Sequence, residues 1–132
     1  MAALHFEFVS PESVLFSGDV DQVDLPGAEG DMGILPDHAP LVTTLRPGIV
    51  TIFRDGKQEP VVVLGGFAEV SPAGLTVLAD KAAAWADFDM ELLASEIKDA
   101  EERIADAKDD VLRDKLSRHI EQLKSLQAAL VS

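Results

Sequence analysis

Apolar and polar positions alternate in short runs over roughly the first 80 residues. Leu4, Phe6 and Phe8 alternate with His5 and Glu7, which is the period-two pattern of a half-buried strand. Further short apolar runs, separated by turn residues, follow at 14–16, 20–25, 49–53, 61–64, 67–70 and 75–79. Short strands at close spacing with regular turns predict an antiparallel sandwich or barrel.

Three turn signals support this interpretation. Asp55-Gly56 predicts a tight hairpin, because both residue types accept the positive φ that such turns require. Gly65-Gly66 lies between two apolar runs and predicts a bulge or a sharp bend. Ser71-Pro72-Ala73-Gly74 predicts a further turn.

The pattern changes after Ala79, since no proline follows Pro72 and no glycine follows Gly74. Ala, Leu, Glu and Lys then dominate, and all four favour helices. Apolar residues recur at alternating steps of three and four, which form one stripe along a helix. The first stripe comprises Met90, Leu93, Ile97, Ala100, Ile104, Ala107 and Val111; the second comprises Leu112, Leu116, Ile120, Leu123, Gln127 and Leu130.

The two stripes are out of phase near Lys108-Asp109-Asp110, which predicts a helical hairpin. Asp109 or Asp110 would cap the second helix. A continuous helix stays open as an alternative because no proline or glycine intervenes, so the segment could exist both folded back and extended. Residues 90–110 carry eight acids and three bases, whereas residues 111–132 carry two acids and four bases, and this opposite charge would support the hairpin.

These patterns predict an α+β chain with two domains. Residues 1–85 form an N-terminal antiparallel β-sandwich, and residues 86–132 form a C-terminal antiparallel hairpin of two helices. Trp85, the only tryptophan, lies where the two patterns meet. A packing hinge between the two parts is the favoured interpretation of this residue, and a partner anchor is the alternative.

Composition narrows the classes of partner. The chain carries 24 acidic and 11 basic residues, a net charge of −13, which disfavours nucleic acid and anionic lipid and favours basic protein surfaces. The absence of cysteine excludes disulfides and thiolate zinc sites. The apolar runs are far shorter than the ~20 residues of a membrane-spanning helix, and the first residues do not form a signal peptide. We therefore expect membrane association only through partners.

Candidate chemistry is sparse. The sequence contains no phosphate-binding Gly-rich loop with its lysine and no HExxH or GxSxG motif. His38 has Asp31 and Asp37 nearby in the sequence, but a surface-loop histidine explains that weak spacing better than a metal site does. Asp19, Asp21 and Asp24 fit a solvated strand face. We predict no catalytic residues, no metal and no cofactor.

One stretch is far more specific. Residues 27–48 read GAEGDMGILPDHAPLVTTLRPG, which closely resembles the signature G-x-x-G-x-x-G-I-x-P-x-H-A-P-L-x-T-x-L-x-P-G of the epsilon-subunit family of F-type ATP synthases. The segments 8–12, 15–18, 65–70 and 75–80 resemble other strands and turns of that family. Gly27, Gly30 and Gly33 would allow a tight, protruding hairpin loop around Ile34, and the prolines of the stretch would stiffen it.

The resemblance implies a non-catalytic rotor subunit that couples proton flow to ATP synthesis at the cytoplasmic face of the bacterial inner membrane. It implies two partners, the gamma subunit and the ring of c subunits, and possible contact between the C-terminal helices and the alpha/beta catalytic head. The family's c-ring-facing loop matches Glu29, Gly30, Asp31, Met32 and Gly33. Its gamma-facing positions match Ser10, His38, Ala39, Pro40 and Thr43.

Some relatives bind ATP through I-D-x-x-R-A at the start of the first helix, or inhibit ATP hydrolysis with an extended tail. The aligned residues here are Phe88, Asp89, Leu92 and Leu93, so the arginine and alanine are both replaced by leucine. Loss of the arginine removes the natural phosphate partner, which predicts weak or absent ATP binding. Two other hypotheses stay open at this point: a free-standing β-sandwich binding module, and a metal-dependent enzyme that uses His38, Asp31 and Asp37.

Overall fold

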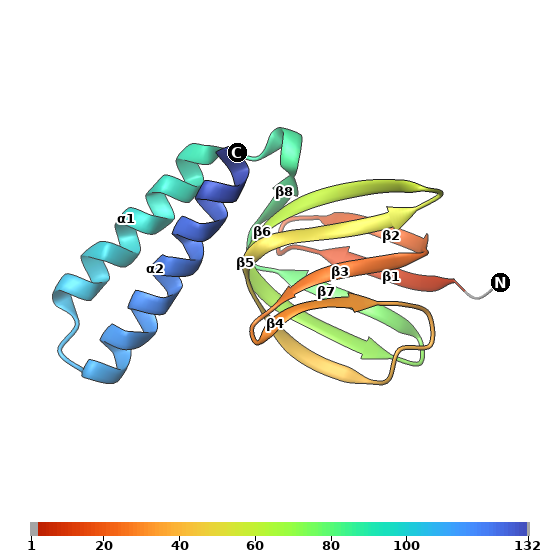
Figure 1. Cartoon of the computed structure of the whole chain (residues 1–132), viewed down its shortest axis with the longest axis horizontal. Coiled ribbons are helices and arrows are strands. Elements are labelled where there is room, and N and C mark those ends of the chain that lie inside the picture. The colour runs from red at the N-terminus through yellow and green to blue at the C-terminus, as the bar shows by residue number, and fades with distance from the viewer. Residues whose placement is uncertain (1–2, 132) are drawn as a thin grey trace. The chain divides into compact units, whose positions relative to one another are not determined.

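The computed structural model describes residues 3–131. It divides into two compact units, with the boundary between Phe88 and Asp89. The first unit is built of strands and the second of two helices, as Figure 1 shows. Within residues 3–131, neither helix combines the length and the apolar character that a membrane span requires.

The strands of the first unit form one sheet with the order β2-β1-β7-β6-β5-β3-β4, and β8 pairs with β6. Every strand pair is antiparallel except β1 with β7, which run parallel. The strands are β1 (Leu4–Val9), β2 (Val14–Val20), β3 (Gln22–Gly27), β4 (Gly30–Ile34), β5 (Leu41–Arg54), β6 (Lys57–Ser71), β7 (Gly74–Ala79) and β8 (Ala82–Ala84). A 3-10 turn, η1 (Trp85–Asp87), follows β8.

The two longest strands, β5 and β6, curve from one layer of the sandwich into the other (Figure 1). Alternating residues of the surrounding strands point into the space between the layers. The core of fully buried large side chains includes Phe6, Phe8, Leu25, Ile34, Ile52 and Leu75. The predicted fold class, a β-sandwich followed by two helices, is confirmed.

The turn predictions can be followed in the backbone. Asp55 and Gly56 connect β5 to β6 with φ angles of 54° and 75°, as a two-residue hairpin requires. Gly65 and Gly66 also have positive φ, but they lie inside one continuous strand whose register with β5 is unbroken. The two glycines therefore mark the bend of β6 and not a bulge.

The second unit contains α1 (Met90–Asp106) and α2 (Asp110–Val131). Its buried residues from the two predicted stripes are Leu93, Ile97, Ala100, Ala107, Leu116, Ile120 and Leu123. Leu126 is also buried, although the second stripe was predicted to continue through Gln127. The Asp109 side chain accepts a hydrogen bond from the Val111 backbone N–H at 2.9 Å, so Asp109 caps α2. Ala107 has extended backbone, and the chain folds back as a hairpin instead of continuing as one helix.

Three predicted details were wrong. Residues 30–33 were expected to form a loop, but they belong to strand β4. The segment 41–48 was not recognised as the first half of β5, because a proline such as Pro47 is typical of a strand end or an interruption. In the structure, Pro47 lies where the pairing of β5 with β3 is interrupted, between Asp24 and Gly27. Val111 and Leu112 were placed on the apolar stripes, yet both are exposed, because they lie in the first turn of α2, where the chain has just reversed.

Candidate functional site

The stretch 27–48 forms the β3–β4 hairpin, the segment that leads from it into β5 and the first half of β5. Gly27 pairs with Gly30, which leaves Ala28 and Glu29 as an exposed two-residue turn. A Cβ on Gly27 would lie 2.7 Å from the Gly30 carbonyl oxygen, so only glycine allows the strands to meet here. The site residues predicted at 29–33 thus share one hairpin, with Met32 half-buried and Glu29 and Asp31 exposed.

Arg46 of β5 holds this hairpin from the side. Its guanidinium donates one hydrogen bond to the Gly27 carbonyl and forms an ion pair with the Asp31 carboxylate. The Ala28 N–H also donates to the Thr44 carbonyl at 2.9 Å, which ties the turn itself to β5. Arg46 contacts both strands of the hairpin close to its turn, so it braces the projecting element against bending.

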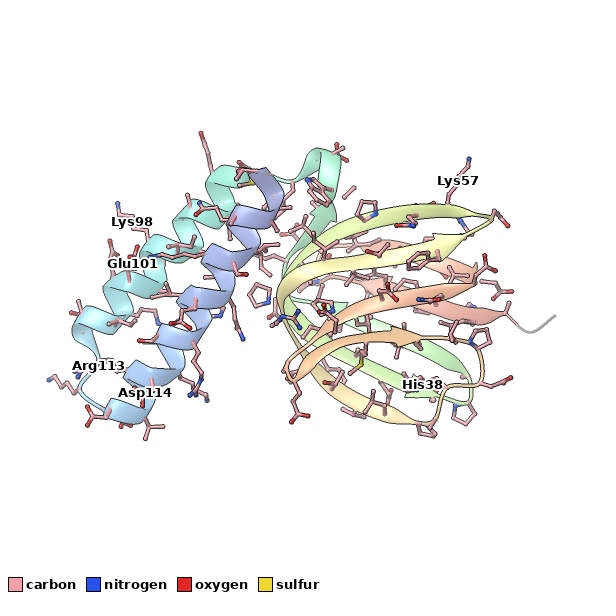
Figure 2. All side chains as sticks on the ribbon, viewed as in Figure 1. His38, Lys57, Lys98, Glu101, Arg113 and Asp114 are labelled. Carbon is pink, nitrogen blue, oxygen red and sulfur yellow. The ribbon has the colours of Figure 1, made fainter. Side chains whose placement is uncertain are left out.

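The segment between β4 and β5 carries the predicted residues His38, Ala39 and Pro40. The His38 N–H donates to the Leu35 carbonyl at 3.2 Å, closing a turn in which Asp37 has a φ of 66°. One ring nitrogen of His38 lies 2.7 Å from its neighbour's carbonyl at Ala39. Figure 2 shows His38 on this segment, at the end of β4 away from the β3–β4 turn. The length of β4 therefore separates His38 from the β3–β4 turn at Ala28 and Glu29.

Ser10 follows β1 and Thr43 lies on β5, two strands that are not neighbours in the sheet. Ser10 closes the turn after β1, where its N–H donates to the Ser13 carbonyl at 2.9 Å. Thr43 is half-buried on β5. In the order β1-β7-β6-β5, three strand spacings separate β1 from β5, about 14 Å. The predicted gamma-facing residues thus lie in three separate segments: the β1–β2 turn, the β4–β5 connection and strand β5.

The outer face of β1 and β2 carries a polar cluster. His5 lies 2.8 Å from Glu7 and 3.3 Å from Asp19, and the Ser17 hydroxyl donates to Glu7 at 2.8 Å. Hydrogen bonds to Glu7 and Asp19 raise the pKa of His5 above its usual value, and the hydrogen bond from Ser17, followed by that from His5, lowers the pKa of Glu7. The cluster is exposed, as expected for His5, and fits a solvated strand pair.

Trp85 belongs to the first unit. It lines a groove of about 900 Å³ together with Phe16, Pro60 and Val61. Its side chain is about one third exposed, at 38 %. The contacts place Trp85 against the sandwich, in the segment that precedes the helical unit.

The segment 88–93, which aligns with the ATP-binding motif, caps and packs the helical unit in this chain. The Asp89 carboxylate accepts a hydrogen bond from the Glu91 N–H at 2.9 Å and caps α1. Leu93 is fully buried between the helices, and Leu92 is half-buried. Neither leucine can donate to a phosphate.

Across residues 3–131, no three His, Asp or Glu side chains come close enough to hold a metal ion. Asp31 is paired with Arg46 near the β3–β4 turn, away from His38. The structure therefore does not assemble the metal site that His38, Asp31 and Asp37 would have formed.

Sequence reasoning missed Arg46. The residue occupies an unspecified (x) position of the signature over 27–48, and its partners lie 15 and 19 positions away. Only the strand register brings it to the hairpin. The one available signal was that Arg46 is the only Lys or Arg in a segment dominated by apolar and acidic residues, which would have favoured an ion pair with a nearby acid.

Comparison with known proteins gives consistent results. The family described as "ATP synthase, Delta/Epsilon chain, beta-sandwich domain" matches residues 3–84. The ATP synthase epsilon chain of Rhodopseudomonas palustris (strain BisB5) is 54% identical over 127 residues, which cover 96% of this chain and 93% of the relative. The ATP synthase epsilon chain of Maricaulis maris (strain MCS10) is 50% identical over 125 residues, covering 95% and 94%.

Solved structures agree with this result. A chain in the structure of the Euglena gracilis mitochondrial ATP synthase, OSCP/F1/c-ring, superimposes with a TM-score of 0.73 at 26% identity, covering 98% of this chain and 82% of that one. A chain of the Tetrahymena thermophila mitochondrial ATP synthase central stalk/c-ring shares the fold, with a TM-score of 0.56 at 11% identity over 64% of this chain and 68% of that one. The chain belongs to the family of ATP synthase epsilon chains.

Proposed function

We propose that this chain is the non-catalytic rotor subunit that joins a gamma subunit to a ring of c subunits, and so helps to couple proton flow to ATP synthesis. The observation that carries the proposal is the braced β3–β4 hairpin: an exposed turn held by Arg46 and by the Ala28–Thr44 hydrogen bond. A rigid projection suits an element that must transmit torque. Such a complex would place the chain at the cytoplasmic face of a bacterial inner membrane.

The hairpin residues Glu29, Gly30, Asp31, Met32 and Gly33 would face the c ring in this proposal. Exposed Glu29 and Asp31 suit basic groups on the polar loops of the ring. Ser10, His38, Ala39, Pro40 and Thr43 would lie toward gamma. Residues 1–85 would thus supply both contacts, and residues 86–132 would form a regulatory tail able to reach the alpha/beta catalytic head.

Charge reversal at the turn tests the contact with the ring. Glu29→Arg in the assembled complex should weaken c-ring binding roughly tenfold if it meets basic loop residues. ATP-driven proton pumping should fall while ATP hydrolysis persists. Lys57→Glu is the matched control, because it also changes the charge by two units but lies at the β5–β6 turn (Figure 2). Equal pumping by the Glu29→Arg complex and the wild type would contradict the proposed role of the hairpin.

Weak or absent ATP binding is part of the same proposal. Asp89 is engaged as a helix cap, and Leu92 and Leu93 supply no phosphate donor. Calorimetry with ATP on the purified chain should detect no binding tighter than about 1 mM. A sub-millimolar dissociation constant would show that another group replaces the missing arginine.

A further inference from the structure

Strands β3 and β5 lose their backbone pairing close to the β3–β4 turn. The ladder between the two strands breaks off at Asp24 and resumes only at Gly27. Pro26 on β3 and Pro47 on β5 lie beside this gap, and a proline has no backbone N–H to donate. The end of the hairpin therefore needs contacts other than the regular ladder to hold it against β5.

Arg46 supplies such contacts from a position next to Pro47. Its guanidinium donates a hydrogen bond of 2.5 Å to the Gly27 carbonyl on β3 and forms an ion pair with the Asp31 carboxylate on β4. The planar guanidinium can serve two acceptors on different strands at once, whereas a lysine ammonium is a single point charge. The side chain of Arg46 is only 29% exposed, so this group lies against the protein and joins three strands.

The two acids of the hairpin have different surroundings. Asp31 already has a cation beside it, because it pairs with Arg46. Glu29 is exposed in the turn and forms no ion pair or hydrogen bond with any residue in the range 3–131. A carboxylate that is paired within its own chain attracts an incoming cation less than an unpaired one does. Glu29 is therefore the acid available to a basic partner, and Asp31 is the acid that fixes the hairpin.

We infer that Arg46 is a positioning residue of the rotor contact: its ion pair with Asp31 fixes the orientation of the β3–β4 turn, and so determines how Glu29 meets a cation of the c ring. The inference rests on the proposed function and refines it, because one acid holds the hairpin and the other contacts the ring. A turn that swings can still bind, but it yields under load. Loss of Arg46 should thus impair coupling more than it releases the chain from the complex.

A double-mutant cycle in the assembled complex tests the pair. Arg46→Gln and Asp31→Asn should each lower the ratio of protons pumped to ATP hydrolysed by roughly threefold, and the double variant should lose no more than Arg46→Gln alone, because either change already breaks the shared contact. ATP hydrolysis and co-purification of the chain should persist. Arg54→Gln is the matched control, since Arg54 is the last residue of β5 and pairs with Glu59. It should keep the wild-type ratio.

Hydrogen exchange in the full chain separates positioning from a general loss of stability. The Ala28 N–H, which donates to the Thr44 carbonyl, should exchange about fivefold faster in Arg46→Gln, because the turn opens locally at a lower free energy. The amides of β1 and β7 pair with each other and should keep their wild-type rates. Glu29→Gln should weaken binding to the c ring and leave the exchange of Ala28 unchanged, as expected of a contact that does not position the turn.

The outcomes separate the two proposals. If the wild-type chain restores no proton pumping to a complex depleted of it, the rotor proposal itself fails. If wild type restores pumping and Arg46→Gln gives the same ratio of protons to ATP, Arg46 does not position the contact, while the rotor function stands. Faster exchange throughout the sandwich in Arg46→Gln would also overturn the inference, because Arg46 would then only stabilise the fold.

Discussion

At the scale of single residues, His5 and Glu7 form a pair whose protonation states support each other. Because the pKa of His5 is raised from 6.5, its contribution to stability is fully present below that pH and is lost as pH rises through the higher folded value. The pKa of Glu7 is lowered from 4.5, so its contribution is present above pH 4.5 and is lost as pH falls through the lower folded value. Both contributions therefore coexist between pH 4.5 and 6.5.

NMR titration of the His5 ring should give a pKa above 6.5 in the wild type. Glu7→Gln removes the main hydrogen-bond partner and should lower the His5 pKa toward 6.5. Glu59→Gln is the control, because that acid pairs with Arg54 and does not contact His5. An unchanged His5 pKa in Glu7→Gln would mean that the pair does not form in solution.

Gly66 and Gly30 provide a matched test of whether a side chain is sterically excluded at a glycine position. Both have similar backbone, with φ of 149° and 146°. A Cβ on Gly66 would lie 2.4 Å from the Leu78 carbonyl oxygen, whereas one on Gly30 would meet nothing within 4 Å. We expect Gly66→Ala to destabilise the sandwich by about 3 kcal/mol and Gly30→Ala by about 1 kcal/mol, measured by urea unfolding. Equal losses would show that the sheet relaxes around the added methyl.

Residues with local partners could be foreseen from the sequence, and residues with distant partners could not. The turn at Asp55-Gly56 was predictable because these two residue types tolerate the positive φ angles that a two-residue hairpin turn requires. Asp109 caps α2 by accepting a hydrogen bond from the backbone N–H only two residues away, at Val111. Arg46 differs, since its role depends on where β3, β4 and β5 align, and no local pattern encodes that register.

At the scale of elements, the helical hairpin depends on contacts at its turn. Arg113 of α2 donates to the Ala107 carbonyl at 2.8 Å and so satisfies the open end of α1. Asp109 caps α2 at the same turn. Figure 2 shows Arg113 at this end of the hairpin, with Lys98 and Glu101 along α1. No glycine or proline enforces the turn, so these two side chains are the main local specification of the folded-back form.

The double variant Asp109→Ala/Arg113→Ala should therefore shift the population toward one continuous helix, since each lost cap costs about 1 kcal/mol. In the hairpin, the Lys124 Nζ lies 3.7 Å from a Glu101 carboxylate oxygen, so the two positions face each other across the helices. In a continuous helix the same positions would be about 35 Å apart. The chain lacks cysteine, so spin labels on Glu101→Cys and Lys124→Cys measure this distance directly.

Labelled protein with the native turn should give a single short distance, and the double variant should add a population near the longer one. Ser117→Ala on α2 serves as the control, because Ser117 is exposed and outside the turn. If the variant keeps only the short distance, the buried leucines and isoleucines alone hold the helices together.

Helices and strands whose apolar residues recur at a regular spacing were predictable from the sequence. Strands that depend on hydrogen bonding to a neighbouring strand were not. The two helices followed from their apolar stripes, and β1 and β7 followed from alternation. Strand β4 reads as a loop because two of its five residues are glycine, and it exists because β3 offers it a full ladder of partners. Likewise β5 extends through Pro47 because β6 pairs along its length.

At the scale of the whole molecule, the division between strands and helices was visible in the sequence because the spacing of apolar residues changes. The two units differ in how much core they possess. The buried residues of the sandwich core lie between positions 4 and 79 and include fully buried Phe6 and Phe8. The helical unit has 44 residues, from Asp89 to Ser132, close to the lower limit of about 40 residues for independent folding.

A chain that ends at Phe88 should consequently fold by itself. Among residues 3–131, those that line the groove around Trp85 all belong to the first unit, so the single tryptophan reports on that unit. We expect the truncated chain to keep the native tryptophan emission maximum, a β-type circular dichroism spectrum and a cooperative melt, because its core and strand pairings are complete. The separate 89–132 fragment should show only partial helicity, since short helices are marginal in water. A truncated chain with fully solvated tryptophan emission would mean that the sandwich requires the helices to fold.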